Sequence, residues 1–301
     1  MRRACRSDVA TALITGINGF TGRYLAEELR STGYTVTGVG HAASDGVFRC
    51  DLLDRTDLMD VLAQVKPDVV VHLAGIAFIA DGDADGVYRT NVVGTRNLLE
   101  AVAKSGCKPS AVLLASSANI YGNATVEPIV ETTPAAPAND YAVSKLAMEY
   151  MARLWFDQLP ITLVRPFNYT GAGQSLDFLL PKIVDHFRRR ASVLELGNLN
   201  VVREFSDVRS VVKRYRLLLE AGQAGEAFNI CSGHGHSLLE VVQMMRELTG
   251  HDPEIRVNPA FVRANEVHRL IGSRVKLDAA IGSVPDIPLR DTLKWMLESP
   301  V

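Results

Sequence analysis

A glycine-rich turn between a predicted strand and a predicted helix limits most strongly what this chain can fold into. Residues 11–15 are apolar, the sequence GINGFTG follows at residues 16–22, and a helical pattern of apolar residues comes next. Glycines at these spacings permit a tight turn and a close approach of the backbone to a pyrophosphate, which rests on the helix N-terminus. Because strand and helix flank the turn, the pattern predicts a dinucleotide-binding site. The candidate residues of the turn are Gly16, Asn18, Gly19, Phe20 and Gly22.

The second predicted strand, residues 35–39, bears on which dinucleotide binds. NAD-binding chains usually carry an acid after this strand, and the acid accepts a hydrogen bond from the ribose 2′-hydroxyl. Here the sequence GHAAS follows, and the first acid is Asp45. Such a loop tolerates a 2′-phosphate, with Arg23, His41 and Ser44 as possible donors, so the sequence favours NADP(H) over NAD(H). In the alternative interpretation His41 is only a loop residue, and either cofactor binds.

Alternating strands and helices over the first 165 residues predict an α/β fold with a doubly wound parallel sheet of the Rossmann type. Strands are expected at residues 11–15, 35–39, 48–50, 68–74, 111–115, 161–165, 193–196 and 228–230. Helices are expected at residues 54–65, 88–104, 138–156, 178–190, 207–221, 237–248, 274–280 and 289–298. After residue 165 the regular alternation of strands and helices gives way to shorter and irregular segments, which predicts a smaller, interleaved α/β substrate-binding lobe. The expected division is residues 1–165 plus about 204–230 for the dinucleotide-binding domain, and about 166–203 plus 231–301 for the other lobe.

Further cofactor contacts are expected where the later strands of this sheet end. An acid after the third strand can reach the adenine amino group, and a glycine after the fourth lets the backbone approach the cofactor. His72 lies within an apolar strand and is interpreted as a hydrogen-bonded core histidine, not as a base. An asparagine in the helix at 88–104 is expected to bond the neighbouring strand end. These candidates are Asp51, Leu52, Ala74, Gly75 and Asn91.

A second candidate site lies in the predicted helix at residues 138–156, where Lys145 follows Tyr141 by four residues. This spacing puts both side chains on one helical face, one turn apart, and Asn139 or Asp140 can cap the first turn. A free tyrosine has a pKa near ~10. A lysine ammonium about 4–6 Å away favours the phenolate and would lower that pKa. The sequence therefore predicts a tyrosine that exchanges a proton with a ketone or alcohol oxygen near neutral pH.

Serines follow the predicted strand at 111–115, at the edge of the sheet where substrate would lie. Ser117 is the candidate there, although serines at such a place also serve as ordinary turn residues.

Composition excludes several functional classes. A net charge of −2 creates no field that would recruit nucleic acid or an anionic membrane. The four cysteines are widely spaced, without a CxxC pair, which indicates neither zinc nor disulfides and suits a reducing compartment. No apolar run approaches the about 18 residues of a membrane span. We therefore expect a cytoplasmic protein without metal, and with neither nucleic acid nor a membrane as its partner.

Together these motifs resemble the extended short-chain dehydrogenase/reductase family, in its nucleotide-sugar branch. The resemblance covers nearly the whole chain: the glycine turn, then Ser117, Tyr141 and Lys145, then RPFN at 165–168, VREFSDV at 202–208 and FNICSG at 228–233. The stretches FNYTGAGQS at 167–175, Arg263-x-x-Glu266 and LIGS at 270–273 look most like the reductases of GDP-4-keto-6-deoxy-D-mannose.

This resemblance implies a role for each candidate residue. Tyr141 would be the acid–base group, Lys145 would modulate its pKa and anchor the cofactor ribose, and Ser117 would bond the sugar C-4 oxygen. Two arginines would clamp the diphosphate, since a planar fork suits two oxygens, and a glutamate would accept a hydrogen bond from the nucleotide ribose. The implied substrate contacts are Asn119, Asn168, Gln174, Lys182, Arg203, Arg263 and Glu266.

The reaction itself stays open between two alternatives at C-4. Related 4,6-dehydratases carry a glutamate two residues after the Ser117 position, and Asn119 cannot replace that base, so elimination of water is not expected. The first alternative is reduction of an NDP-4-keto-6-deoxyhexose, and the second is a C-4 epimerase that interconverts dTDP-L-rhamnose and dTDP-6-deoxy-L-talose. A non-catalytic dinucleotide sensor would be expected to lose the Tyr–Lys pair. The resemblance also implies a homodimer, paired through helices at 88–104 and 140–156, and a place in deoxyhexose biosynthesis for lipopolysaccharide O-antigen.

Overall fold

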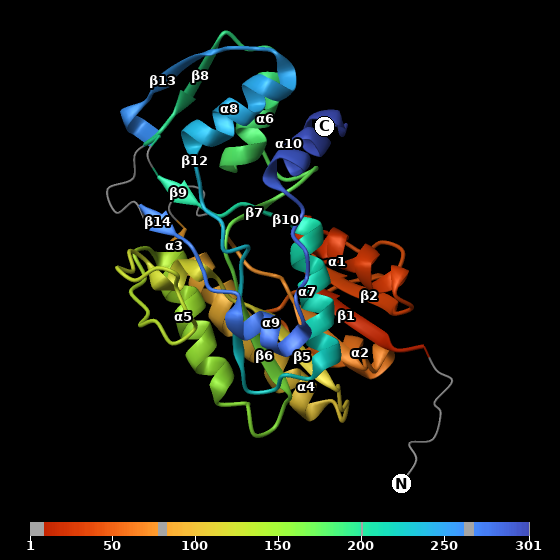
Figure 1. Cartoon of the computed structure of the whole chain (residues 1–301). Helices are drawn as coiled ribbons and strands as arrows, with labels where there is room; N and C mark the ends of the chain where they lie inside the picture. Colours follow the sequence, from red (N-terminus) through yellow and green to blue (C-terminus); the bar gives the residue numbers. More distant parts are fainter. Residues whose placement is uncertain (1–8, 78–82, 200, 262–267, 301) are drawn as a thin grey trace. The chain divides into compact units, whose positions relative to one another are not determined.

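The structure, a computed structural model, describes residues 9–77, 83–199, 201–261 and 268–300 (Figure 1). The strands are β1 (Thr11–Thr15), β2 (Thr35–Gly40), β3 (Val47–Arg49), β4 (Val69–His72), β5 (Ala111–Ala115), β6 (Ile161–Pro166), β7 (Tyr169–Thr170), β8 (Val193–Leu196), β9 (Val202–Arg203), β10 (Ser206–Asp207), β11 (Ala227–Ile230), β12 (His236–Ser237), β13 (Glu254–Val257) and β14 (Arg269–Leu270). The α-helices are α1 (Phe20–Ser31), α2 (Arg55–Val65), α3 (Ala84–Tyr88), α4 (Thr95–Lys104), α5 (Asp140–Arg153), α6 (Leu179–Arg188), α7 (Val208–Ala221), α8 (Leu238–Thr249), α9 (Val275–Ile281) and α10 (Leu289–Glu298). A π-helical turn, η1 (Arg89–Gly94), and two 3-10 turns, η2 (Ala118–Tyr121) and η3 (Pro259–Phe261), complete the set.

A seven-stranded sheet with the order β11-β6-β5-β4-β1-β2-β3 confirms the predicted doubly wound fold. The pairs β3-β2, β2-β1, β1-β4 and β4-β5 are parallel. The chain runs outward from β1 to β3, returns to β4 and then runs the other way, so the winding reverses between β1 and β4. Val69, Val70 and Val71 of β4 are at most 3% exposed, as expected for a parallel strand covered on both faces.

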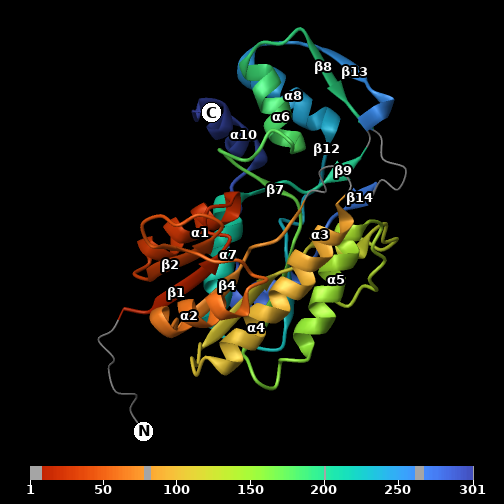
Figure 2. The same ribbon diagram turned by 180° about the vertical axis from the view of Figure 1, so that it is seen from behind.

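Helices cover both faces of this sheet. On one face α2 packs against α4, which lies toward the viewer in Figure 2. On the other, α7 lies beside α1 (Figure 1). Arg216 Nε of α7 donates a hydrogen bond to Glu28 of α1 at 2.7 Å. The carboxyl ends of the parallel strands therefore share one edge, where the loops carry the candidate cofactor residues.

By packing, the chain divides into two compact units that alternate along the sequence. The first holds the described residues of Met1–Ala115, Ala147–Leu163 and Tyr215–Glu226, and the second those of Ser116–Leu146, Val164–Arg214 and Ala227–Val301. Three of the divisions fall inside elements, namely α5, β6 and α7. The assignment of a cofactor domain and a substrate lobe, with the bounds expected from the sequence, stays a prediction.

The second unit contains a helical layer with its own core. Helices α6, α8 and α10 enclose buried side chains that include Phe187, Met245 and Leu293. The parallel pair β8-β13 lies beside them in Figure 1 and contributes Leu194 to the same core. None of the described helices combines the length and apolar character that a membrane crossing requires.

Two predicted helices need correction. The single helix expected at 88–104 is α3, the π-helical turn η1 and α4 in succession. The helix expected to reach residue 156 ends at Arg153, where a series of turns begins. The sequence also did not predict β13 or five two-residue strands, since two residues are too few to show an alternating pattern.

Candidate active site

In the first unit, the glycine turn lies against the residue that follows β4 by two positions. Gly16 has a φ of +73°, and a Cβ there would lie 2.8 Å from the backbone nitrogen of Ala74. A Cβ on Gly22 would lie 2.2 Å from the carbonyl oxygen of Gly16. Both positions therefore exclude a side chain, because the turn packs closely against backbone atoms of the chain itself.

Helix α1 begins at this turn, with a glycine as its N-cap residue. Gly19 is the N-cap residue and makes no side-chain cap hydrogen bond. The first N–H groups of a helix carry partial positive charge and bind anions. The turn and helix end thus fit the pyrophosphate of a dinucleotide, with Phe20 and Arg23 in the first turn of the helix.

The loops after β2 and β3 lie on the same edge of the sheet. Asn18 lies against Gly40, because a Cβ on Gly40 would be 3.1 Å from Asn18 Nδ2. His41 follows Gly40 and is exposed, as is Asp51, whose carboxylate accepts a hydrogen bond from Leu53 N at 2.9 Å. The first unit thus brings together at this edge the candidates Gly16, Asn18, Gly19, Phe20, Gly22, Arg23, His41, Asp51, Leu52, Ala74, Gly75 and Asn91.

Two polar side chains of the sheet have the structural partners that the sequence predicted. His72 Nδ1 lies 2.6 Å from Thr15 Oγ1, and its Nε2 lies 2.8 Å from Thr95 Oγ1. This confirms a hydrogen-bonded core histidine. Asn91 accepts a hydrogen bond from Ile76 N at 2.9 Å and donates to Ile76 O at 3.1 Å. Asn91 therefore fixes the loop that contains Ala74 and Gly75.

In the second unit, Ser117 and Tyr141 come into contact from segments 24 residues apart. Asn139 caps α5, since its Oδ1 accepts the Ala142 N–H at 2.9 Å, and this sets Tyr141 in the first helical turn. Ser117 follows β5 as the N-cap of η2, where its Oγ accepts the Asn119 N–H at 3.1 Å. The Ser117 side chain also hydrogen-bonds the Tyr141 phenol. Lys145, one turn further along α5, is 7% exposed.

The predicted lowering of the Tyr141 pKa is not found in the structure. Burial disfavours the phenolate and raises the pKa of Tyr141 to about 12. The hydrogen bond from Ser117 lowers this pKa, and nearby Tyr169 raises it further. Desolvation therefore outweighs the favourable contact, and the phenol is protonated at neutral pH.

The predicted substrate residues that the structure describes all lie in the second unit. Asn168 O accepts the Ser206 N–H at 3.0 Å, and Gln174 Nε2 donates to Tyr169 O at 3.3 Å. The ammonium of Lys182 lies 4.0 Å from the centroid of the Phe261 ring. All five described candidates are half-buried: Asn119, Asn168, Gln174, Lys182 and Arg203. The other two, Arg263 and Glu266, lie outside the described residues.

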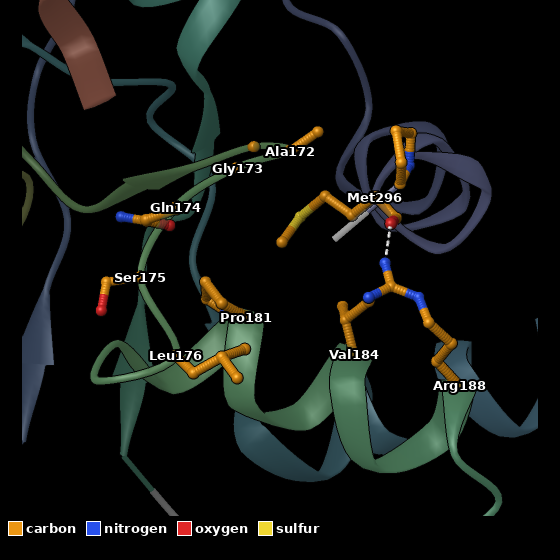
Figure 3. A pocket seen from close by; sticks show the side chains of 11 residues that line it. Ala172, Gly173, Gln174, Ser175, Leu176, Pro181, Val184, Arg188 and Met296 are labelled. Carbon is orange, nitrogen blue, oxygen red and sulfur yellow. Dashed lines mark hydrogen bonds between the residues drawn. The ribbon is translucent and has the colours of Figure 1, made fainter. Parts of the chain in front are cut away.

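A cavity of about 200 Å³ lies beside Gln174 in this unit, but its chemistry differs from that of a sugar site. Figure 3 shows Leu176, Val184 and Met296 around it, with Arg188 donating to the Met296 carbonyl oxygen at 2.5 Å. The cavity is smaller than the about 300–1,000 Å³ of most ligand pockets, and its lining is mainly apolar. We therefore do not assign it to substrate.

Sequence reasoning missed two residues with a bearing on this chemistry. The sequence around Tyr169 indicates only an irregular turn, but this residue raises the pKa of Tyr141. Glu204 stands out in the sequence only as part of the motif VREFSDV, but its side chain is fully buried. Among the described residues, no group of three or more histidine, cysteine, aspartate or glutamate side chains is arranged to hold a metal ion.

Comparison with known proteins agrees with this geometry. Residues 12–231 match the model of the NAD dependent epimerase/dehydratase family. GDP-6-deoxy-D-talose 4-dehydrogenase from Aggregatibacter actinomycetemcomitans is 34% identical, over 90% of this chain and 91% of that protein. GDP-6-deoxy-D-mannose reductase from Pseudomonas aeruginosa is 32% identical, over 94% of this chain and 95% of that protein.

Solved structures give the same result. A protein from Burkholderia cenocepacia J2315, described only as a candidate epimerase, is 50% identical with a TM-score of 0.91, over 96% of this chain and 97% of that one. The structure of RMD from Pseudomonas aeruginosa complexed with NADPH is 31% identical with a TM-score of 0.85, over 96% of each chain. The chain belongs to the NAD-dependent epimerase/dehydratase family, that is, to the extended short-chain dehydrogenases/reductases.

Proposed function

We propose that this enzyme acts at C-4 of a nucleotide-activated 6-deoxyhexose and reduces an NDP-4-keto-6-deoxyhexose of the GDP-4-keto-6-deoxy-D-mannose type. The observation that carries the proposal is the hydrogen bond between Ser117 and the protonated Tyr141, with Lys145 one helical turn away. Two relatives support the choice, because one is named a 4-dehydrogenase and the other a reductase of GDP-6-deoxyhexoses.

Each of the described candidate residues would have a separate role in this reaction. Bound NADPH would supply the hydride to the ketone carbon. Tyr141 would give its proton to the C-4 oxygen, since its raised pKa keeps it protonated before the reaction. Ser117 would donate a hydrogen bond to that oxygen and hold it beside the phenol. Lys145 would stabilise the phenolate that remains, and Arg203 would bind the diphosphate.

C-4 epimerisation, as between dTDP-L-rhamnose and dTDP-6-deoxy-L-talose, is the second candidate. It is favoured by the similarity to the Burkholderia cenocepacia protein described as a candidate epimerase. The same serine, tyrosine and lysine serve both reactions, because an epimerase oxidises C-4 and then reduces it from the opposite face.

One pair of assays separates the two functions. We expect the enzyme to consume NADPH when a GDP- or dTDP-4-keto-6-deoxyhexose is added, with a single product configuration by NMR. The second assay incubates the enzyme with dTDP-L-rhamnose and a catalytic amount of NAD(P). Conversion to the C-4 epimer there, without net NADPH oxidation in the first assay, would contradict the reductase.

We further propose that NADP(H) is preferred over NAD(H), because exposed Arg23 and His41 flank the place of the adenosine ribose. Arg23→Ala should weaken NADPH binding about tenfold, the effect of losing about 1.4 kcal/mol of attraction to a 2′-phosphate, and should leave NADH binding unchanged. Fluorescence titration of both nucleotides measures this difference. Arg30→Ala, in the last turn of the same helix, is the control. Equal losses for NADPH and NADH would refute the assignment.

A homodimer through α5 is also part of this proposal. Val143 and Tyr150 are 38% and 62% exposed, and a spacing of seven places them on one side of α5; Leu154, the first residue after the helix, is 77% exposed. We expect light scattering to give twice the chain mass of 32.8 kDa. Tyr150→Asp should shift the protein to monomer, because a charge would be buried in the interface. Leu239→Asp, at a 50% exposed position on α8, should stay dimeric. A dimeric Tyr150→Asp protein would exclude this face.

A further inference from the structure

The carboxylate of Glu204 is buried completely and is surrounded by hydrogen-bond donors. Its Oε2 accepts the Ser232 N–H at 2.5 Å, the Ser232 hydroxyl at 2.9 Å and the Gly233 N–H at 3.1 Å. Its Oε1 accepts the Gly272 N–H at 2.6 Å. Burial raises the pKa of Glu204, while these donors oppose that rise. All four partners donate, so they match an ionised carboxylate, and such charge-assisted bonds are strong.

These donors flank the small sheet that contains Arg203. The strand order is β12-β9-β14, and within it Arg203 of β9 lies opposite His236 and Leu270. Each strand has only two residues, so the ladder contains few backbone hydrogen bonds. Glu204 follows β9 directly, and its donors precede β12 on one side and follow β14 on the other. A single side chain therefore ties the central strand to the connections of both neighbours.

The backbone around these donors has little freedom to move. Gly233 has a φ of +78°, which aims its N–H at the carboxylate. A Cβ on Gly272 would lie 2.6 Å from the Phe167 ring and 2.9 Å from Cys231 Sγ. The connections are thus held against the buried cluster of Phe167, Cys231 and Leu270. Through its hydrogen bonds to these connections, Glu204 holds the end of β9 in a fixed position relative to this cluster.

We propose that Glu204 is a positioning residue for the nucleotide diphosphate, because it fixes the strand from which Arg203 projects. This inference rests on the proposed function, in which Arg203 binds the diphosphate. A guanidinium that donates hydrogen bonds to two phosphate oxygens must be correctly oriented, because it is planar. The backbone that carries the arginine therefore has to be fixed. Glu204 itself touches neither substrate nor cofactor in this proposal.

The test is Glu204→Gln. The amide keeps the size of the side chain, but its NH₂ group would face a backbone N–H. The hydrogen bonds that one of the two carboxylate oxygens accepts would therefore be lost. We expect the dissociation constants of GDP and dTDP, whichever binds, to rise about tenfold in calorimetry, as for one buried donor left unpaired. The sugar KM should rise by the same factor, while kcat and the NADPH dissociation constant stay within about twofold of wild type.

A matched control separates positioning from general destabilisation. In Glu240→Gln the same exchange affects a carboxylate that accepts the N–H of Ser237, the last residue of β12, at 2.7 Å, without a bond to β9 or β14 among the described residues. This variant should bind the nucleotide as wild type does. If Glu204→Gln does not fold, Ser232→Ala removes one of the four donors and should raise the same dissociation constant about threefold.

The outcomes distinguish this inference from the function on which it rests. Wild-type binding of GDP or dTDP, with unchanged binding in Glu204→Gln, would overturn the positioning role alone. If Glu204→Gln does not fold, unchanged nucleotide binding in Ser232→Ala would likewise overturn the positioning role. If the wild-type enzyme binds neither nucleotide, the proposed function fails, and the positioning role fails with it.

Discussion

Replacement of Tyr141 by phenylalanine should lower kcat about 10²–10⁴-fold, the usual contribution of a positioned proton donor. The phenol is the group that Ser117 contacts, and it is protonated at neutral pH. Without its hydroxyl, the developing C-4 alkoxide would have no acid beside it. NADPH affinity should stay within a few-fold of wild type, because the glycine turn and α1 are unchanged. Stopped-flow reduction of the 4-keto sugar, with NADPH titrated separately, measures both quantities.

Tyr150→Phe is the matched control, since it removes a hydroxyl from an exposed tyrosine of the same helix and should leave kcat unchanged. The same pair of variants tests the pKa. Because the folded pKa of about 12 exceeds that of a free tyrosine, the folded enzyme should bind this proton more tightly than the unfolded chain. The stability from this group is present below about pH 10 and is lost as the pH rises through about 12. Turnover that survives in Tyr141→Phe with NADPH still bound would refute the proposed acid.

The second large effect is expected from Gly16→Ala. The new Cβ would lie 2.8 Å from Ala74 N and 2.9 Å from Ala74 Cα, and backbone atoms cannot move aside as a flexible side chain can. The turn must open, and the first N–H groups of α1 move with it. We expect NADPH binding to weaken by more than about 100-fold, the equivalent of about 2.7 kcal/mol. Thermal unfolding should also begin at a lower temperature.

Gly33→Ala separates this clash from backbone strain. Gly33 has a φ of +94°, yet a Cβ there would meet nothing within 4 Å. Its replacement should cost about 1–2 kcal/mol of stability, as for any left-handed residue, and should not change NADPH affinity. If both alanine variants bind NADPH equally well, the close contact of Gly16 with Ala74 has no part in cofactor binding.

Local chemistry explains what the sequence predicted correctly. The cap at Asn139 and the partners of Asn91 and His72 depend on residues whose preferences are strong and whose neighbours are close or lie on an adjacent strand. The glycine turn was predictable because few residues other than glycine can adopt its conformation. The parallel sheet followed from unbroken β-branched runs such as that of β4.

The remainder depends on contacts between distant segments. The pKa of Tyr141 is determined by its burial, by Ser117 and by Tyr169, and helical spacing from Lys145 contains none of this information. Glu204 resembles an ordinary surface glutamate in the sequence, because three of its four donors are backbone N–H groups far along the chain. The strands around it are likewise formed by tertiary pairing and have no local pattern.

The π-helical turn Arg89–Gly94 has a consequence for how this region is compared between relatives. Such a turn contains one residue more than an α-helical turn, so everything after it is rotated by about 100° relative to a uniformly wound helix. The buried apolar residues Leu98, Leu99 and Val102 of α4 follow this turn and carry that offset. A homologue with a regular helix here would align correctly only with a one-residue gap inside the helix.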